Sequence, residues 1–417
     1  MIVKSIKDVC AINPKGTLDT FTGLDISFVP MKAVSTTGHI NTEKRITVDR
    51  VKNYTVFREG DILFAKITPC MENGKGAIAV NLHNGYGAGS TEFIVLRPDL
   101  SQVTAEWIQL FLSQKAFRLH CQQHMTGSAG QKRVPAKFLG ACTIPVPPLE
   151  EQNRIVARIE ELFSELDNGV ETLQKTKQQL AVYRQAVLKQ AFEGHFTAHQ
   201  QLCMELPWAS KEETATLPDI PAEWRYVSLS KLGDLGRGKS KHRPRNDAKL
   251  FESGKYPFIQ TGDVKAAKRY ITEYSKMYGE FGLQQSKLWP KGTLCITIAA
   301  NIAETAFLGI EACFPDSVVG FTPFEHVCSE YVKHFIESQK LRLWAFAPAT
   351  AQKNINLDTL ENLIIPYCSL GEQKAVVSEI ESRMTICDNI ERTVDTALQQ
   401  AEAMRQSILK KAFEGKI

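Results

Sequence analysis

No two of the ten cysteines form a Cys-x-x-Cys pair, and they are scattered along the chain. This distribution argues against a zinc site or a disulfide framework and favours free thiols in a reducing compartment. Long apolar runs are also missing, because the most apolar stretch, residues 294–314, contains Asn301, Glu304 and Glu311. The first ten residues do not have the pattern of a signal peptide. We therefore expect a cytoplasmic protein without a membrane segment.

Catalytic motifs are absent as well. There is no Asp/Asn-Pro-Pro-Tyr/Phe motif of an amino-methylating site and no glycine-rich loop for a dinucleotide or for S-adenosylmethionine. Three Pro-Asp pairs, at Asp99, Asp219 and Asp316, lack the downstream Glu-x-Lys of a nuclease. We expect a protein that is not an enzyme, with no catalytic residue and no cofactor of its own.

Histidine spacing gives no strong metal signal. His120, Cys121 and His124 have the i, i+4 spacing of a helical metal site, but no third class of ligand is nearby. We interpret them as a half-exposed helix end, and His195 and His199 as linker residues, so no metal site is expected.

Residues 233–240 match the phosphate-loop pattern Gly-x4-Gly-Lys-Ser/Thr, but their context is wrong for it. A nucleotide loop must open a helix whose N-terminus meets the phosphates, whereas residues 241–245 (Lys-His-Arg-Pro-Arg) show no apolar periodicity. We discount nucleotide binding. Dense positive charge on a glycine-containing loop instead suggests contacts with DNA phosphates, and a solvated basic loop is the alternative.

Other basic residues near turns give weaker signals of the same kind, and the net charge of +4 permits nucleic-acid binding without demonstrating it. The candidate DNA-binding residues are Lys66, Asn73, Lys75, Lys132, Arg133, Arg237, Lys239, Lys241, Arg243, Arg245, Lys265, Lys268 and Arg269.

The most informative feature is an internal repeat. Residues 148–194 return near the end of the chain at an ungapped offset of 221, the separation of Gln152 and Gln373. Each copy has heptad-spaced apolar residues without an interrupting proline, which predicts a helix of about forty residues and roughly 60 Å. A glycine follows each helix as a left-handed cap, at Gly194 and Gly415. The residues expected to pack along these helices are Ile159, Leu166, Leu173, Leu180, Val187, Ile380, Val394 and Ile408.

Charge predicts how the two helices pair. The front half of each is mainly acidic and the back half is basic, so antiparallel packing sets acidic against basic halves and opposes the helix dipoles. The alternative is that each helix packs only on its own globular domain or mediates homodimerisation.

The segments before the helices also correspond. Short strand-like runs dominate residues 1–147, and this segment also contains a predicted helix over 104–120 and a basic loop over 127–133. Residues 221–367 repeat this order of elements. Gln352 and Lys353 correspond to Gln131 and Lys132 at the 221 offset. We predict an α+β protein with a pseudo-two-fold repeat: recognition domains over 1–147 and 221–367, long helices over 148–194 and 368–417, and a linker over 195–220.

This layout resembles the specificity subunit of type I restriction-modification systems over essentially the whole chain. The resemblance is in the segments that open, close and precede the helices and in short motifs within the two domains. They are Pro148-Leu-Glu-Glu-Gln152, Leu370-Gly-Glu-Gln373, Lys189-Gln-Ala-Phe-Glu-Gly194, Lys410-Lys-Ala-Phe-Glu-Gly415, Gly127 to Arg133, Ile67-Thr-Pro-Cys-Met-Glu-Asn-Gly-Lys-Gly76, Ser90-Thr-Glu-Phe93 and Gln260-Thr-Gly-Asp-Val264.

The resemblance implies two target-recognition domains that each read half of a split, asymmetric site in double-stranded DNA. It also implies two methyltransferase subunits, which supply S-adenosylmethionine and methylate adenine, and a restriction motor-nuclease that uses ATP and Mg. A rival interpretation is a coiled-coil scaffold whose globular halves bind protein rather than DNA.

Overall fold

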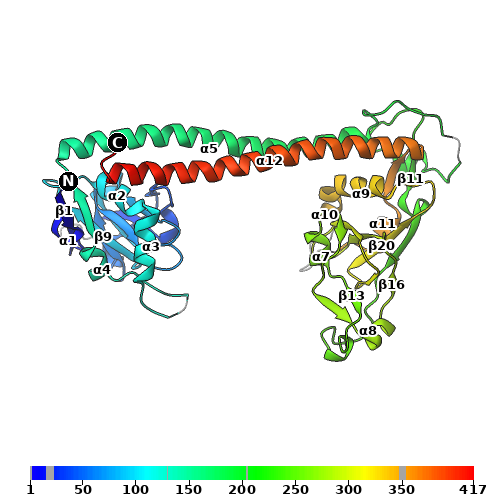
Figure 1. The fold of residues 1–417 in the computed structure, drawn as a ribbon, viewed down its shortest axis with the longest axis horizontal. Coiled ribbons are helices and arrows are strands. Elements are labelled where there is room, and N and C mark those ends of the chain that lie inside the picture. Colours follow the sequence, from blue (N-terminus) through cyan, green and yellow to red (C-terminus); the bar gives the residue numbers. More distant parts are fainter. Residues whose placement is uncertain (1, 16–22, 129, 203–204, 347–353) are drawn as a thin grey trace. The chain divides into compact units, whose positions relative to one another are not determined.

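The computed structural model describes residues 2–15, 23–128, 130–202, 205–346 and 354–417. The chain forms two compact units (Figure 1). Unit 1 comprises Met1–Lys175 and Val394–Ile417, and unit 2 comprises Thr176–Thr393. Each unit therefore contains one globular domain and part of each long helix.

Unit 1 is built on two four-stranded sheets and one two-stranded ribbon. The sheet orders are β2-β9-β6-β7 and β4-β3-β8-β5, and β1 pairs with β10. The strands are β1 (Ile2–Ser5), β2 (Cys10–Ile12), β3 (Asp25–Val29), β4 (Arg45–Thr47), β5 (Thr55–Arg58), β6 (Ile62–Ala65), β7 (Gly76–Ile78), β8 (Tyr86–Gly89), β9 (Phe93–Pro98) and β10 (Thr143–Val146). The α-helices are α1 (Ile6–Val9), α2 (Ala105–Ser113), α3 (Lys115–Gln123) and α4 (Ala136–Ala141).

Unit 2 repeats this topology and adds one edge strand. Its sheet orders are β12-β20-β17-β18-β14 and β15-β13-β19-β16, and β11 pairs with β21. The strands are β11 (Arg225–Ser228), β12 (Gly233–Arg237), β13 (Tyr256–Phe258), β14 (Tyr270–Ile271), β15 (Lys276–Tyr278), β16 (Leu288–Trp289), β17 (Leu294–Thr297), β18 (Thr305–Leu308), β19 (Ala312–Cys313), β20 (Val318–Pro323) and β21 (Ile364–Tyr367). The helices are α6 (Lys211–Thr214), α7 (Thr261–Ala266), α8 (Glu280–Gln284), α9 (Ser329–Ser338), α10 (Lys340–Phe346) and α11 (Leu357–Glu361).

The repeat predicted from the sequence is confirmed strand by strand. The tight turns before β6 and β17 contain Gly60 and Gly292, whose φ angles are 81° and 88°. Only glycine adopts this backbone conformation without strain. Each unit has a parallel pair within an otherwise antiparallel four-stranded sheet, β3 with β8 and β13 with β19. The added edge strand β14 of unit 2 also pairs parallel, with β18.

The two long helices are α5 (Leu149–Phe192) and α12 (Leu370–Phe413), each of 44 residues. Gly194 and Gly415 follow them with φ angles of 83° and 71°, so the predicted left-handed caps are present. Within the described residues, no helix combines the length and the hydropathy that crossing a lipid bilayer requires.

Ion pairs confirm that α5 and α12 run antiparallel in both units. In unit 1 Arg405 pairs with Asp167. In unit 2 the equivalent Arg184 pairs with Asp388 at 2.6 Å and also with Glu391 at 3.0 Å. Of the predicted packing residues, Ile159, Leu180, Val187, Ile380 and Val394 are buried, and Leu166, Leu173 and Ile408 are half-buried.

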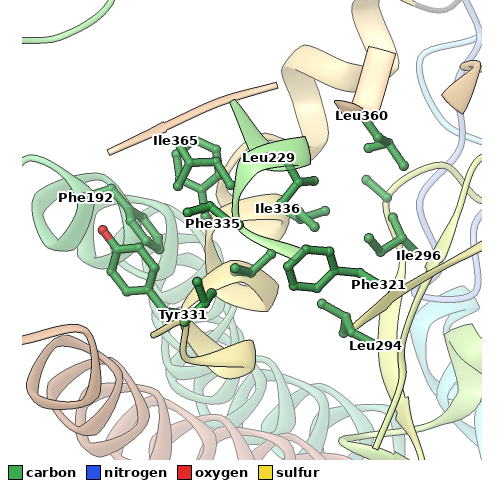
Figure 2. Packing of buried hydrophobic residues seen from close by; sticks show 14 of the residues in the cluster. Phe192, Leu229, Leu294, Ile296, Phe321, Tyr331, Phe335, Ile336, Leu360 and Ile365 are labelled. Atoms are coloured by element: carbon green, nitrogen blue, oxygen red, sulfur yellow. The ribbon is translucent and has the colours of Figure 1, made fainter. Parts of the chain in front are cut away.

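Each globular core is completed by the far end of the helix that began in the other repeat. Phe413 of α12 packs on Trp107 in unit 1, with ring centroids 4.4 Å apart. Phe192 of α5 packs edge-on against Tyr331 and Phe335 in unit 2, each at 5.1 Å (Figure 2). The helix ends are therefore part of the domain cores.

One predicted helix is wrong in detail. The pattern over 104–120 predicts a single helix, but α2 ends at Ser113 and α3 starts at Lys115, with Gln114 extended at ψ 129°. The Lys115 amide, which the break frees, donates to the Gln406 side chain of α12 at 2.8 Å. A tertiary partner from a distant segment thus stabilises the break.

The segment predicted as a linker is packed rather than free where it is described. Thr197 and His199 hydrogen-bond to the buried Glu372 carboxylate, and Trp208 packs against the core of unit 2. The predicted match at Gln352 and Lys353 lies outside the described residues.

Candidate DNA interface

The basic loop of unit 2 connects β12 to a turn at residues 248–250. Gly238 starts it and donates its amide to Val318 O at 2.9 Å. A Cβ at Gly238 would lie 2.3 Å from Pro315 O, so only glycine fits there. Ser286 donates its hydroxyl to Lys239 O at 2.8 Å, and Lys241 N donates to Gln285 O at 3.1 Å. The backbone of the loop is held at several points.

The residues that match the phosphate-loop pattern do not have the structure of a nucleotide-binding loop. Residues 233–237 are strand β12, and an extended loop follows where a nucleotide site needs a helix N-terminus. Gly233 is required for packing, since a Cβ there would lie 2.4 Å from Thr322 O. The motif does not form a nucleotide loop.

Three of the five loop cations are engaged inside the protein. Arg245 donates from Nη2 to both carboxylate oxygens of Asp316 at 2.8 Å, and Arg237 donates to Asp316 O at 2.5 Å. Arg243 donates to Ser240 O. Among the described residues, Lys239 and Lys241 are exposed and have no ion-pair partner.

The second basic group of unit 2 lies partly against α12. Arg269 bridges Glu330 of α9 and Glu381 of α12, both at 3.1 Å, and lies over the Tyr270 ring. Lys265 reaches Asn301 Oδ1 at 3.5 Å. Lys268 is exposed. Arg269 therefore joins the domain to the helix, a role that its sequence context did not reveal.

Most candidates in unit 1 also have internal partners. Lys66 donates to Thr91 O at 2.7 Å, and Lys75 donates to Met31 O at 3.1 Å. Asn73 and Lys132 are exposed.

Arg133 makes a forked pair with Glu92, and the hydrogen bond from Arg133 holds the pKa of the Glu92 carboxyl below its ordinary value. The pair fastens the described part of the 127–133 loop to the segment before β9. Both units thus use one carboxylate, Glu92 or Asp316, to fix a basic loop.

Sequence reasoning missed Arg118, which lines a hollow of about 760 Å³ in unit 1. Its guanidinium is buried, which lowers its pKa to about 10, and it donates to Met71 O at 2.8 Å. Arg118 thereby supports the turn that presents Asn73. Arg118 lies with Phe117 and Cys121 on the buried side of α3, and a charged residue type gave no sign of that burial in the sequence.

His120, Cys121 and His124 lie at the C-terminal end of α3. His124 stacks on Phe138 with ring centroids 4.2 Å apart, and burial raises the pKa of the Cys121 thiol to about 12. No group of three potential ligands occurs among the residues that the structure describes.

The family model and the relatives found by comparison with known proteins all describe type I restriction specificity subunits or domains. The family model "Type I restriction modification DNA specificity domain" matches residues 1–180 and again 221–400. The chain is similar to the specificity subunits of the Escherichia coli type I restriction enzymes EcoAI, at 40% identity over 222 residues, and EcoEI, at 34% over 226 residues. These matches span 53% and 54% of this chain but only 34% of each relative's length. The putative MjaX specificity subunit of Methanocaldococcus jannaschii is 23% identical over 371 residues, 86% of this chain and 78% of the relative.

Two solved structures share the fold. One, from work on complex assembly and conformational transition of the type I R-M system, has a TM-score of 0.82 at 20% identity and covers 100% of this chain and 98% of that one. The other, the HsdS subunit from Thermoanaerobacter tengcongensis, has a TM-score of 0.60 at 20% identity, with 100% and 97% coverage.

Proposed function

Because this chain belongs to the type I restriction modification DNA specificity family, we propose that it is the specificity subunit of a type I restriction-modification complex. In this role each unit reads one half of a split, asymmetric site in double-stranded DNA. Phosphate contacts set the register of each unit on the duplex, and side chains that reach base edges read the sequence.

The observation that best supports this proposal is the repeated sheet order with divergent loops. The two units share their strand order, yet the basic loop of unit 2 has no counterpart of similar sequence in unit 1. A scaffold that bound two copies of one protein would have no need of different loops on the same frame. Reading two different half-site sequences requires different loops on the two units.

The long helices support a partner present in two copies. Asn168 and Thr172 are exposed in unit 1, and the identical residues Asn389 and Thr393 are exposed in unit 2. Identical exposed residues at the 221 offset offer the same surface twice. We propose that two methyltransferase subunits dock on the chain. Native mass spectrometry of the reconstituted complex should give two methyltransferases per chain, and a single copy would contradict this stoichiometry.

The chemistry in this account belongs to the partners. The methyltransferase supplies S-adenosylmethionine and methylates adenine, and a restriction motor-nuclease supplies ATP hydrolysis with Mg. This chain contributes recognition without catalysis or a cofactor, and it acts in the cytoplasm, where the DNA is.

A filter-binding assay with the chain and its methyltransferase tests DNA reading against the scaffold alternative. A DNA reader should prefer one duplex sequence and lose affinity steeply between about 50 and 200 mM salt. Equal, weak binding to all duplexes would favour a scaffold.

A further inference from the structure

A polar hollow of about 250 Å³ opens in unit 2 beside the basic loop. One wall is the end of that loop, another is the junction of β13 and α7, and a third is the turn between β19 and β20. Its polar lining includes Arg245, Asn246, Thr261 and Ser317, together with Gln260 and Lys276.

The hollow is preformed because Asp316 ties two of its walls together. Its carboxylate accepts from Arg245 Nη2 at 2.8 Å, and its carbonyl accepts from Arg237 Nε at 2.5 Å. The close approach of Gly238 to Pro315 seats the start of the loop on the same turn. A fixed wall presents its side chains in one geometry, which specific recognition requires.

Several side chains around the hollow have unused hydrogen-bonding groups. Within the part of the chain that the structure describes, the side chains of Asn246, Thr261 and Ser317 have no hydrogen-bond partner in the protein. Asn246 is exposed, and the other two are half-buried. An amide offers both donors and an acceptor, and a hydroxyl can act as either. In the major groove an Asn amide pairs with adenine, and Ser and Thr hydroxyls also hydrogen-bond to base edges.

Free positive charge lies on the same loop. Lys239 and Lys241 are exposed, and the hydrogen bonds of their backbone hold their Cα positions. Arg245 is neutralised by Asp316. Arg237 and Arg243 keep their charge but donate to backbone carbonyls. Among the described residues, Lys239 and Lys241 are therefore the loop cations whose charged groups are left without a partner in the protein.

We propose that this hollow is where unit 2 reads base edges, with Asn246, Thr261 and Ser317 as specificity-determining residues and Lys239 and Lys241 as phosphate contacts. Asp316 is a positioning residue, because it fixes the loop and keeps Arg245 from adding an unspecific phosphate contact. This inference rests on the proposed function and assigns its chemistry to particular side chains.

The test uses the full chain with its methyltransferase, selection from a randomised duplex library, and affinities measured at several salt concentrations. In the triple variant Asn246→Ala, Thr261→Ala, Ser317→Ala, discrimination at one half of the recognised site should fall about tenfold for every base whose hydrogen bond is removed. The other half, which unit 1 reads, should be unchanged and serves as an internal control. Thr272→Ala, at an exposed position of unit 2 outside the hollow, should change neither half.

The lysine variant should behave differently. Lys239→Ala with Lys241→Ala should weaken binding to every sequence and reduce the salt slope by about two units, with the recognised sequence unchanged. Lys291→Ala, an exposed lysine of the same unit, is the matched control.

The variant Asp316→Asn distinguishes a role of Asp316 in positioning the basic loop from a general loss of structure in unit 2. It retains the side-chain shape but releases Arg245, so the salt slope should become steeper by about one unit and discrimination should fall. A damaged unit would bind more weakly without a steeper slope, and that result would remove the role assigned to Asp316.

A triple variant that keeps the wild-type sequence preference at both halves would overturn the assignment of the hollow. If the wild-type complex itself shows no sequence preference, the proposed function fails as well. The two failures are therefore distinguishable.

Discussion

Glu337 on α9 is the centre of a largely buried charge network in unit 2. Its carboxylate accepts hydrogen bonds from Lys333 Nζ at 2.7 Å and from Thr305 on β18 at 3.0 Å, and it pairs with His334 at 3.0 Å. Burial raises the pKa of the carboxyl, but the hydrogen bond from His334 and the charges of Lys333 and His334 outweigh it and lower the pKa to about 2. The network attaches α9 to the sheet.

The network predicts a pH dependence of stability. The folded pKa lies below the ordinary value of 4.5, so the carboxylate stabilises the fold fully above pH 4.5 and loses this effect as the pH falls toward 2. In urea unfolding of the full chain, the wild type should lose more stability between about pH 6 and pH 3 than Glu337→Gln. The exposed control Glu311→Gln should follow the wild type. If the free energy of unfolding changed with pH in the same way in all three proteins, the lowered pKa assigned to Glu337 would be contradicted.

Gln152 and Gln373 satisfy equivalent backbone groups in the two units. Gln152 accepts from Thr104 N at 3.0 Å and donates to the carbonyls of Gln102 and Pro147 at 2.8 Å. Gln373 likewise accepts from Cys328 N at 2.9 Å and donates to Cys368 O at 2.8 Å. Each buried amide thus ties the start of a long helix to the segment that enters α2 or α9.

Gln152→Ala should destabilise unit 1 by about 3 kcal/mol, because a buried backbone group that loses its partner costs about 1–3 kcal/mol. The exposed neighbour Asn153 gives the matched control, and Asn153→Ala should change stability by less than about 0.5 kcal/mol. Chemical denaturation measures both. Equal, small effects would show that water replaces the removed amide.

At this scale the sequence reveals residue types and not their partners. The density of cations on the basic loop was visible, but Asp316 lies 71 positions from Arg245, and Glu92 lies 41 positions from Arg133. Pairing over such separations depends on the folded chain. The same limit hid the polar hollow, whose lining residues come from four separate segments of the described chain.

At the scale of elements, the ends of α5 and α12 have the same role in different units. Leu188, Ala191 and Phe192 enter the core of unit 2, and Leu409, Ala412 and Phe413 pack in the core of unit 1. The motif that ends each helix is therefore a core segment as well as a helix terminus. Apolar spacing predicted that these residues pack, and the structure identifies what they pack against.

Phe413→Ala should destabilise unit 1 by about 2–4 kcal/mol, somewhat less than the roughly 3–5 kcal/mol typical of a fully buried Phe, because Phe413 is half-buried. Met404 on the same helix is 54% exposed, so Met404→Ala should cost less than about 0.5 kcal/mol. Limited proteolysis should then cut unit 1 faster in the Phe413 variant alone. Similar digestion of both variants would show that the helix end is not part of the core.

Helix existence was predictable, but one boundary was not. Caps and heptad spacing fixed α5 and α12, since these signals are local. The break between α2 and α3 depends on the Gln406 side chain, which contacts Lys115 across 291 positions. A local pattern cannot contain that contact.

For the whole molecule, the repeat makes a prediction about a shorter chain. The segment that completes unit 1 has the sequence Leu409-Lys-Lys-Ala-Phe413, and α5 contains its near copy Leu188-Lys-Gln-Ala-Phe192. A fragment of residues 1–194 can therefore use α5 of a second copy to complete its core, which favours a two-fold homodimer. Analytical ultracentrifugation should detect a dimer, and with the methyltransferase it should read a palindromic split site. A monomer at tens of micromolar would contradict this pairing.

The central claim is that each unit reads its own half of one DNA site. The most direct measurement exchanges residues 225–365 for the corresponding segment of a relative that recognises a different sequence, and then maps the methylated sites of a host that carries the chain with its methyltransferase. One half of the recognised site should change, and the half read by unit 1 should remain. If both halves change together, or if neither does, the two units are not independent readers.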